Sequence, residues 1–349
     1  MDDISVFGTI YSAKTLHSSL EKAFRTNMEL LSSRVEIHRT DIKSRLATLT
    51  LVVRMESDVK TVSLLVKETT ETELIVLSLL NKLLPFSVPK IIMYQQAGRG
   101  FWVVLENVTS WVDIGGRHRV NESLLDGLYT IHRAFYGREA ILREHFDLSD
   151  VSMEDLVRVT ITALQGIEEL SKVISTFTEL KWEEVAESIR AYLSTVKDLS
   201  FPKVLLHGSY CPSSCRAFID SSGETHVIAY DWQFAALGWP QIDLVVLLDR
   251  LTIIAEAQGL LDPSPSVLQR YVLRLVEEFG TEPKEFYEVF RLCYLCRATS
   301  LVKWWASLLR DSPQCDPKRA YLEIESKLKT LKFVASNDFV ERSLDERVR

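Results

Sequence analysis

The sequence predicts a two-lobed α+β protein in which a small, mostly antiparallel sheet precedes a larger helical region. Runs rich in β-branched residues are concentrated in residues 1–108, whereas residues 121–198 and 240–332 carry apolar side chains at helical spacing. We therefore expect an N-terminal lobe over residues 1–108, a helical lobe over 109–334 and a charged tail over 335–349. A chain of 349 residues is long enough for two such domains.

The N-terminal lobe is expected to contain five strands and two helices. The first helix is predicted over residues 12–31 from its apolar spacing, and the second over Glu71–Leu84, which stops before Pro85 because proline cannot continue a helix. Gly98 and Gly100 supply the backbone freedom for a hairpin between the last two strands. The five strands are predicted at Val35–Thr40, Arg45–Met55, Val59–Glu68, Lys90–Gln95 and Phe101–Val108.

The helical lobe is interrupted once, by short strands and turns. Asn121 is a predicted helix cap, Val151–Lys172 is a predicted long helix, and the chain from Pro240 to Lys332 is again helical in pattern. The interruption contains three predicted strands, at Lys203–His207, Ala217–Asp220 and Thr225–Asp231.

The composition excludes two classes of partner. Hydrophobic residues make up 46% of the chain, and the formal net charge is −7. Nucleic-acid-binding proteins usually carry a basic stripe, and the sequence has none, so we expect no nucleic-acid partner. The longest apolar stretches, such as Ile242–Leu248, are too short to cross a bilayer, so we expect no membrane insertion.

The N-terminus and the cysteines predict a cytoplasmic protein. Met1-Asp2-Asp3 is acidic and no apolar run follows it, unlike a secretory signal. Five cysteines, an odd number, indicate free thiols in a reducing compartment.

The most informative segment runs from Val204 to Leu244. Its order and spacing resemble the catalytic core of the aminoglycoside phosphotransferase, choline kinase and ecdysteroid kinase-like superfamily, in which His-Gly-Asp is followed by an Asn, a hairpin, Asp-Trp or Asp-Trp-Gln, and an Asp-Leu that starts a helix. The resemblance implies a bilobal, protein kinase-like fold that binds ATP and Mg²⁺ between its lobes. The matching residues are His207-Gly208-Ser209, Ser214, Asp231-Trp232-Gln233, Gly238 and Asp243-Leu244.

Two decisive positions depart from the family pattern. Ser209 stands where the family has its catalytic Asp, and Ser214 where it has a metal-binding Asn, while Asp231 matches the second metal ligand. A serine hydroxyl has too high a pKa to accept a proton near neutral pH. The resemblance thus implies Asp231 and Ser214 as metal-binding positions, with Ser214 a weak ligand. It also implies that His207 and Asp243 are structural residues of the loop and the next helix.

The N-terminal lobe carries further, more generic matches. Lys67 resembles the lysine that contacts the nucleotide phosphates, and Glu73 resembles its ion-pair partner, with Glu71 as the competing choice. Glu106, at the end of a predicted strand, resembles the entrance to the hinge that meets adenine. The Gly-rich turn of the family is absent from Asp41–Arg45. Outside such a motif, a strand-end lysine and a helix glutamate are usually only solvated.

Three functions are compatible with these residues. The first is a pseudokinase or atypical phosphotransferase that binds a nucleotide together with a peptide, protein or small-molecule partner. The second is an active small-molecule kinase whose base comes from elsewhere, for example from Asp220 or Glu224 in the hairpin. The third is a zinc-stabilised interaction module using Cys211, Cys215, Cys293 and Cys296, although cysteines in an apolar helical stretch are usually core residues.

Overall fold

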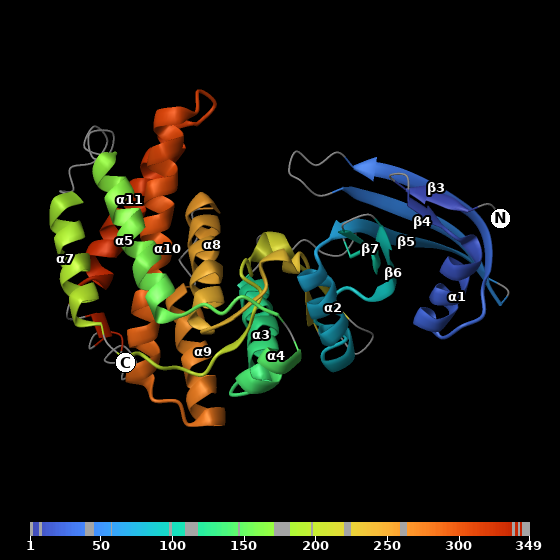
Figure 1. Ribbon diagram of the computed structural model, residues 1–349, viewed down its shortest axis with the longest axis horizontal. Helices are drawn as coiled ribbons and strands as arrows, with labels where there is room; N and C mark the ends of the chain where they lie inside the picture. Colours follow the sequence, from blue (N-terminus) through green and yellow to red (C-terminus); the bar gives the residue numbers. More distant parts are fainter. Residues whose placement is uncertain are drawn as a thin grey trace. The chain divides into compact units, whose positions relative to one another are not determined.

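The computed structural model of the protein forms two compact units (Figure 1). The sheet unit consists of Met1–Ile131, Arg143–Leu148 and His207–Ala235, and the helical unit consists of His132–Leu142, Ser149–Leu206 and Ala236–Arg349. The structure describes residues 3–343 except 7–8, 39–44, 57, 98–99, 109–117, 146, 171–181, 197, 220–224, 259–263, 337–338 and 341–342. The predicted α+β class, with an antiparallel sheet and a large helical region, is confirmed.

A five-stranded antiparallel sheet forms the framework of the sheet unit (Figure 1). Residues in β4 (Leu46–Met55) alternate between buried and half-buried, so Leu49, Leu51 and Val53 share the face that packs with Leu16 and Leu20 of helix α1 (Ala13–Phe24). The strand order is β3 (Glu29–His38), β4 (Leu46–Met55), β5 (Asp58–Thr69), β7 (Gly100–Glu106) and β6 (Ile91–Ala97). The five predicted strands are therefore present and pair as an antiparallel sheet.

The N-terminal segment differs from the prediction in two details. Helix α1 spans Ala13–Phe24 and ends at Arg25, whose left-handed backbone (φ 53°) closes the helix, so the predicted extension to residue 31 is wrong. Leu30 and Leu31 beyond it belong to β3, because pairing with β4 outweighs their helical spacing. Two short strands, β1 (Ile4–Val6) and β2 (Thr9–Tyr11), form a hairpin that the sequence did not predict.

Helix α2 (Glu71–Leu83) follows β5 almost directly. The side chain of Thr70 accepts a hydrogen bond from the backbone N–H of Glu73 and so caps the helix. Leu77 and Leu80 face the interior of the unit. This connection places the first turn of α2 beside the end of β5, where Lys67 lies.

The loop-and-hairpin segment also belongs to the sheet unit. It contains η1 (Pro212–Ser214), β9 (Cys215–Ile219), β10 (Thr225–Ala229) and η2 (Trp232–Phe234), and the two strands pair with Ala229 opposite Cys215. The hydroxyl of Tyr210 donates to the carbonyl of Leu124 in α3 (His118–Phe135), which begins before the predicted Asn121.

Long helices dominate the helical unit. Helix α10 contacts α5, α8, α9 and α11 (Figure 1). Two short strands, β8 (Val204–Leu206) and β11 (Ala236–Gly238), pair with each other. Within the described ranges, no helix combines the length and apolarity that crossing a bilayer requires. Helix α10 spans Pro283–Asp311, and the other helices of this unit are α5 (Met153–Glu169), α7 (Trp182–Thr195), α8 (Gln241–Gln258), α9 (Ser264–Phe279) and α11 (Pro317–Val334). Helix α4 (Glu139–His145) has residues in both units.

Some predicted features lie outside the described residues. These are the centre of the hairpin at 98–99, the turn at 41–44 that lacks glycine, and the hairpin residues Asp220 and Glu224.

Candidate functional site

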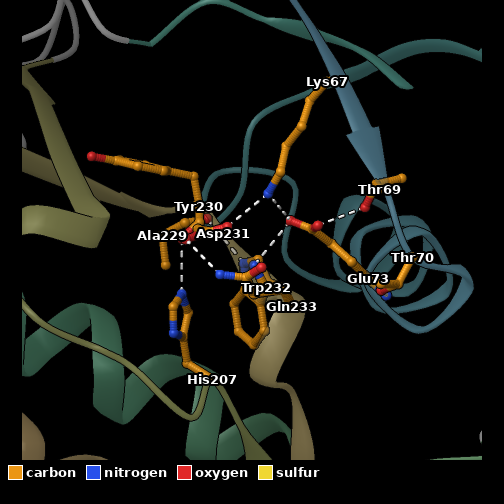
Figure 2. A network of polar contacts seen from close by, with 10 residues as sticks. All are labelled: Lys67, Thr69, Thr70, Glu73, His207, Ala229, Tyr230, Asp231, Trp232 and Gln233. Atoms are coloured by element: carbon orange, nitrogen blue, oxygen red, sulfur yellow. Dashed lines mark hydrogen bonds and ion pairs between the residues drawn. The ribbon is translucent and has the colours of Figure 1, made fainter. Parts of the chain in front are cut away.

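The predicted ion pair between β5 and α2 is present. Lys67 Nζ lies 2.9 Å from Glu73 Oε1, and the two side chains are 12% and 2% exposed (Figure 2). The competing candidate, Glu71, is exposed. Because Glu73 lies in the first turn of α2, its carboxylate also interacts favourably with the positive end of the helix dipole.

Glu73 joins three segments that are distant in the sequence. Its Oε2 accepts a hydrogen bond from the hydroxyl of Thr69 (2.5 Å), and its Oε1 accepts one from the backbone N–H of Trp232 (3.1 Å) (Figure 2). The carboxylate therefore ties β5 and α2 to the segment that follows β10, and all of these residues belong to the sheet unit.

Asp231 lies on the other side of the lysine. Lys67 Nζ is 2.7 Å from Asp231 Oδ1, and the amide of Gln233 donates to Oδ2 at 3.4 Å (Figure 2). Asp231 is 43% exposed, so solvent reaches its carboxylate. Its backbone is left-handed (φ 71°, ψ 58°), which is uncommon for a residue with a side chain. Such conformations persist where the surrounding structure enforces them, and they are concentrated at functional sites.

The two carboxylates keep Lys67 charged. Burial alone would lower the pKa of Lys67, but the negative charges of Glu73 and Asp231 outweigh it and raise the pKa above its ordinary value. At neutral pH the site therefore presents an ammonium group between two carboxylates.

His207 supports the loop through both ring nitrogens. Its Nδ1 accepts a hydrogen bond from the backbone N–H of Ser209 (3.2 Å), which requires Nε2 to carry the proton and donate to the carbonyl of Tyr230 (3.0 Å). The ring is 1% exposed and lies 4.6 Å from the ring of Trp232, centroid to centroid. A neutral imidazole thus connects the Ser209 backbone to the residue preceding Asp231.

Gly208 is required by both conformation and space. Its φ is +79°, and a Cβ atom at this position would lie 2.3 Å from the backbone oxygen of Phe234. The loop can therefore approach η2 this closely only with glycine.

Ser214 uses its hydroxyl within the loop. The oxygen accepts the backbone N–H of Cys211 (3.1 Å), and the proton is within reach of the carbonyls of Ser209 (2.8 Å) and Cys211 (3.0 Å). The residue is 7% exposed. The hydroxyl thus helps to fix the turn around η1, and its role as a metal ligand stays a prediction.

A cavity of about 210 Å³ opens beside the charged cluster. Lys67, Glu73 and Asp231 form its polar end, and Glu106 also lines it. Burial raises the pKa of Glu106, and the nearby Lys90 offsets only part of this effect. The apolar walls were not predicted from the sequence, although the alternation of apolar and polar residues along the strands could have indicated which side chains share a face. They comprise Leu46, Leu65, Leu77, Pro89, Leu105 and Val108.

Asp243 lies in the helical unit, in the first turn of α8. Its side chain is fully buried, with Oδ2 3.4 Å from Nε2 of His132, whose Nδ1 lies 2.6 Å from the hydroxyl of Tyr271. This environment is consistent with the structural role expected for Asp243.

The four cysteines of the zinc hypothesis are divided between the two units, with Cys211 and Cys215 in the sheet unit and Cys293 and Cys296 in the helical unit. All five cysteines of the chain are free thiols, and among the described residues no group of three or more His, Cys, Asp or Glu side chains is placed to hold a metal ion. Burial raises the pKa of Cys215, Cys293 and Cys296, as expected of thiols packed in an apolar interior. The zinc hypothesis stays a prediction.

Several solved structures share this fold. An aminoglycoside phosphotransferase from Alicyclobacillus acidocaldarius is similar with a TM-score of 0.56 and 12% identity, over 89% of this chain and 92% of the other. A thermostable mutant of aminoglycoside phosphotransferase APH(4)-Ia, in a ternary complex with AMP-PNP and hygromycin B, has a TM-score of 0.53 and 8% identity, over 93% and 100%. The GDP complex of aminoglycoside 2′-phosphotransferase-IIIa has a TM-score of 0.50 and 14% identity, over 92% and 98%.

These similarities define the class of fold. No protein-family model matches the chain, and no curated protein matches it in sequence. At such low identity the structural likeness establishes the fold alone. The chain therefore has the bilobal, kinase-like fold of the aminoglycoside phosphotransferases, which the residues between Val204 and Leu244 predicted.

Proposed function

We propose that the protein binds ATP with Mg²⁺ at the cavity beside Lys67 and has lost, or greatly slowed, phosphoryl transfer. One observation carries this proposal. Lys67, Glu73 and the strained Asp231 meet within hydrogen-bond distance at the polar end of a cavity with apolar walls.

The chemistry of the cavity suits part of a nucleotide. Leucine side chains from β4, β5 and β7 offer an apolar surface for a base, and the Lys67 ammonium can neutralise phosphate charge. Ligand pockets usually enclose about 300–1,000 Å³, so this cavity would enclose the base and leave the phosphates towards solvent. Two proteins of the same fold were solved with GDP and with AMP-PNP, which supports a nucleotide here.

Asp231 is the residue that would hold the metal. Mg²⁺ is commonly bound by one or two carboxylates together with phosphate oxygens and water, and Asp231 supplies one half-exposed carboxylate. The Ser214 hydroxyl already accepts one backbone N–H and donates its proton within the loop, so at most one lone pair is left for a metal. When bound, the metal would neutralise charge on the phosphates.

The missing element is a proton acceptor. An aspartate beside the acceptor hydroxyl typically contributes 10²–10⁴-fold to the rate, and Ser209 cannot replace it near neutral pH. The protonated Nε2 of His207 is already directed at a carbonyl. We therefore favour a cytoplasmic nucleotide-binding pseudokinase that acts through a protein, peptide or small-molecule partner.

Thermal unfolding of the full chain tests nucleotide binding. ATP with Mg²⁺ at 100 times its dissociation constant should stabilise the wild type by about 2.7 kcal/mol. Lys67→Met should reduce this ligand-induced shift and weaken binding at least ~10-fold, or about 1.4 kcal/mol, because the phosphates lose their cation. Lys60→Met is the matched control, since Lys60 is an exposed residue of the same strand and should leave the shift unchanged.

Two results would contradict the proposal. One is the absence of any shift with ATP and Mg²⁺ in the wild type. The other is an undiminished shift in Lys67→Met, which would place the nucleotide elsewhere.

A further inference from the structure

A second and larger cavity lies in the helical unit, among α8, α9, α10 and α11 and the residues after α11. Its volume is about 520 Å³, within the range of about 300–1,000 Å³ usual for small-molecule pockets. Aromatic side chains dominate its apolar walls, which include Leu268, Tyr287, Phe290, Tyr294, Phe333 and Phe339.

A buried ion pair also lines this cavity. Asp249 of α8 and Lys327 of α11 are 4% and 5% exposed, and Lys327 Nζ contacts Asp249 Oδ1. The second carboxylate oxygen, Oδ2, accepts no hydrogen bond from any residue that the structure describes. Arg297 Nη2 lies 3.6 Å from it, which is an ion pair but is too long for a good hydrogen bond.

Buried oxygens without a donor are rare in folded proteins because desolvation of the group is not compensated. Since Asp249 lines a cavity, a donor brought by a bound molecule would supply the missing hydrogen bond. The cavity thus has apolar walls and one carboxylate oxygen that lacks a hydrogen-bond donor. Small-molecule sites usually combine apolar walls with a few polar groups in this way.

The charges around Asp249 indicate which molecule fits. Burial alone would lower the pKa of Lys327, but Asp249 outweighs it and the pKa is raised, so the lysine stays charged. Glu323 lies close enough to interact with both, and burial raises its pKa. Arg297 adds a second positive charge. The two charged residues that line the cavity itself, Asp249 and Lys327, carry opposite charges, so neither a cation nor an anion gains from entering.

We propose that this cavity binds a small uncharged molecule with an aromatic or cyclic apolar body and one hydroxyl or amide N–H group, which donates to Asp249 Oδ2. All the residues involved belong to the helical unit, so the inference does not depend on nucleotide binding.

Four naphthalene derivatives test the assignment on the full chain, by ligand-observed NMR titration. 2-Naphthalenemethanol is uncharged and carries an O–H donor, and 2-(methoxymethyl)naphthalene lacks the donor. 2-Naphthylmethylamine and 2-naphthoate add a positive and a negative charge. We expect the alcohol to bind with a sub-millimolar dissociation constant, roughly 10-fold tighter than the ether, as one added hydrogen bond predicts. We also expect it to bind tighter than the amine and the carboxylate, because each of these brings a charge into the cavity.

Two variants locate the site. Leu268→Trp should narrow the cavity and weaken binding of the alcohol at least ~10-fold, whereas Leu273→Trp, at an exposed position of the same helix, should leave binding unchanged. Asp249→Leu combined with Lys327→Met removes both members of the ion pair, so that no unpaired charge of this pair remains buried. In this double variant the ratio of the dissociation constants of the ether and the alcohol should fall to about one.

Several outcomes would overturn the proposal. They are no detectable binding of the alcohol at millimolar concentration, tighter binding of the amine or the carboxylate, and unchanged binding in Leu268→Trp. Should the double variant fail to fold, the Leu268→Trp and Leu273→Trp pair still decides the question.

Discussion

The charged cluster around Lys67 and the loop from His207 to Ser214 belong to the same compact unit. They differ in how many residues of the family motif they contain. The cluster contains the lysine and the two carboxylates that the family resemblance implies for a phosphate site. The loop retains its frame, held by His207, but carries serines where a catalytic Asp and a metal-binding Asn are expected. In the proposed function, nucleotide binding and proton acceptance would therefore depend on different side chains of one framework.

The largest effect is expected from restoring the proton acceptor. Ser209→Asp should raise ATP turnover by about 10²–10⁴-fold over the wild type, because the loop frame is intact. Release of ADP, followed by a coupled assay, measures this. Ser209→Asn has the same shape without a basic group and should not raise turnover. An equal rise in both variants would show that shape, and not a base, limits the reaction.

Gly208→Ala should break the frame itself. The new Cβ would meet the backbone oxygen of Phe234 while the chain holds φ at +79°, so we expect a loss of about 3 kcal/mol or more in the free energy of unfolding. Gly137→Ala is the control, since Gly137 has φ +69° but open space around it, and should cost about 1 kcal/mol. Urea denaturation compares the two, and equal losses would contradict the close approach of loop and η2.

Glu73→Ala should disturb the cluster to a smaller extent. Three donors lose their acceptor, among them the buried N–H of Trp232, but Lys67 keeps Asp231 as a partner. We expect a loss of about 2–3 kcal/mol in stability by urea denaturation. Glu71→Ala, at an exposed position of the same helix turn, should change stability by less than about 0.5 kcal/mol. A comparable loss in both would mean that the network contributes little.

The smallest effect concerns Glu106 and pH. Burial raises the pKa of Glu106 in the folded state. Between the pKa values of the unfolded and folded states, the folded protein therefore binds more protons than the unfolded protein. The free energy of unfolding consequently falls as pH rises through that range. Glu106→Gln removes this cost, so the variant should be more stable than the wild type at pH 7 and equal to it below pH ~4. Urea denaturation at the two pH values tests this; a less stable variant at pH 7 would contradict it.

The sequence identified the charged residues better than the surfaces around them. Lys67, Glu73 and Asp231 could be found because each holds a recognisable place in a motif or strand. The cavity walls could not, because Leu46 lies opposite Lys67 only through the register of β4 on β5. The loop hydrogen bonds of Ser214 and the early end of α1 depend likewise on tertiary contacts that spacing does not encode.

Calorimetric titration of the wild-type chain with ATP and Mg²⁺, followed by ³¹P NMR of the same sample, decides whether the protein binds a nucleotide without hydrolysing it. We expect one nucleotide bound per chain, with ATP remaining intact over hours. Absence of binding heat would contradict this expectation, and so would ADP formation at the ~1–100 s⁻¹ typical of kinases.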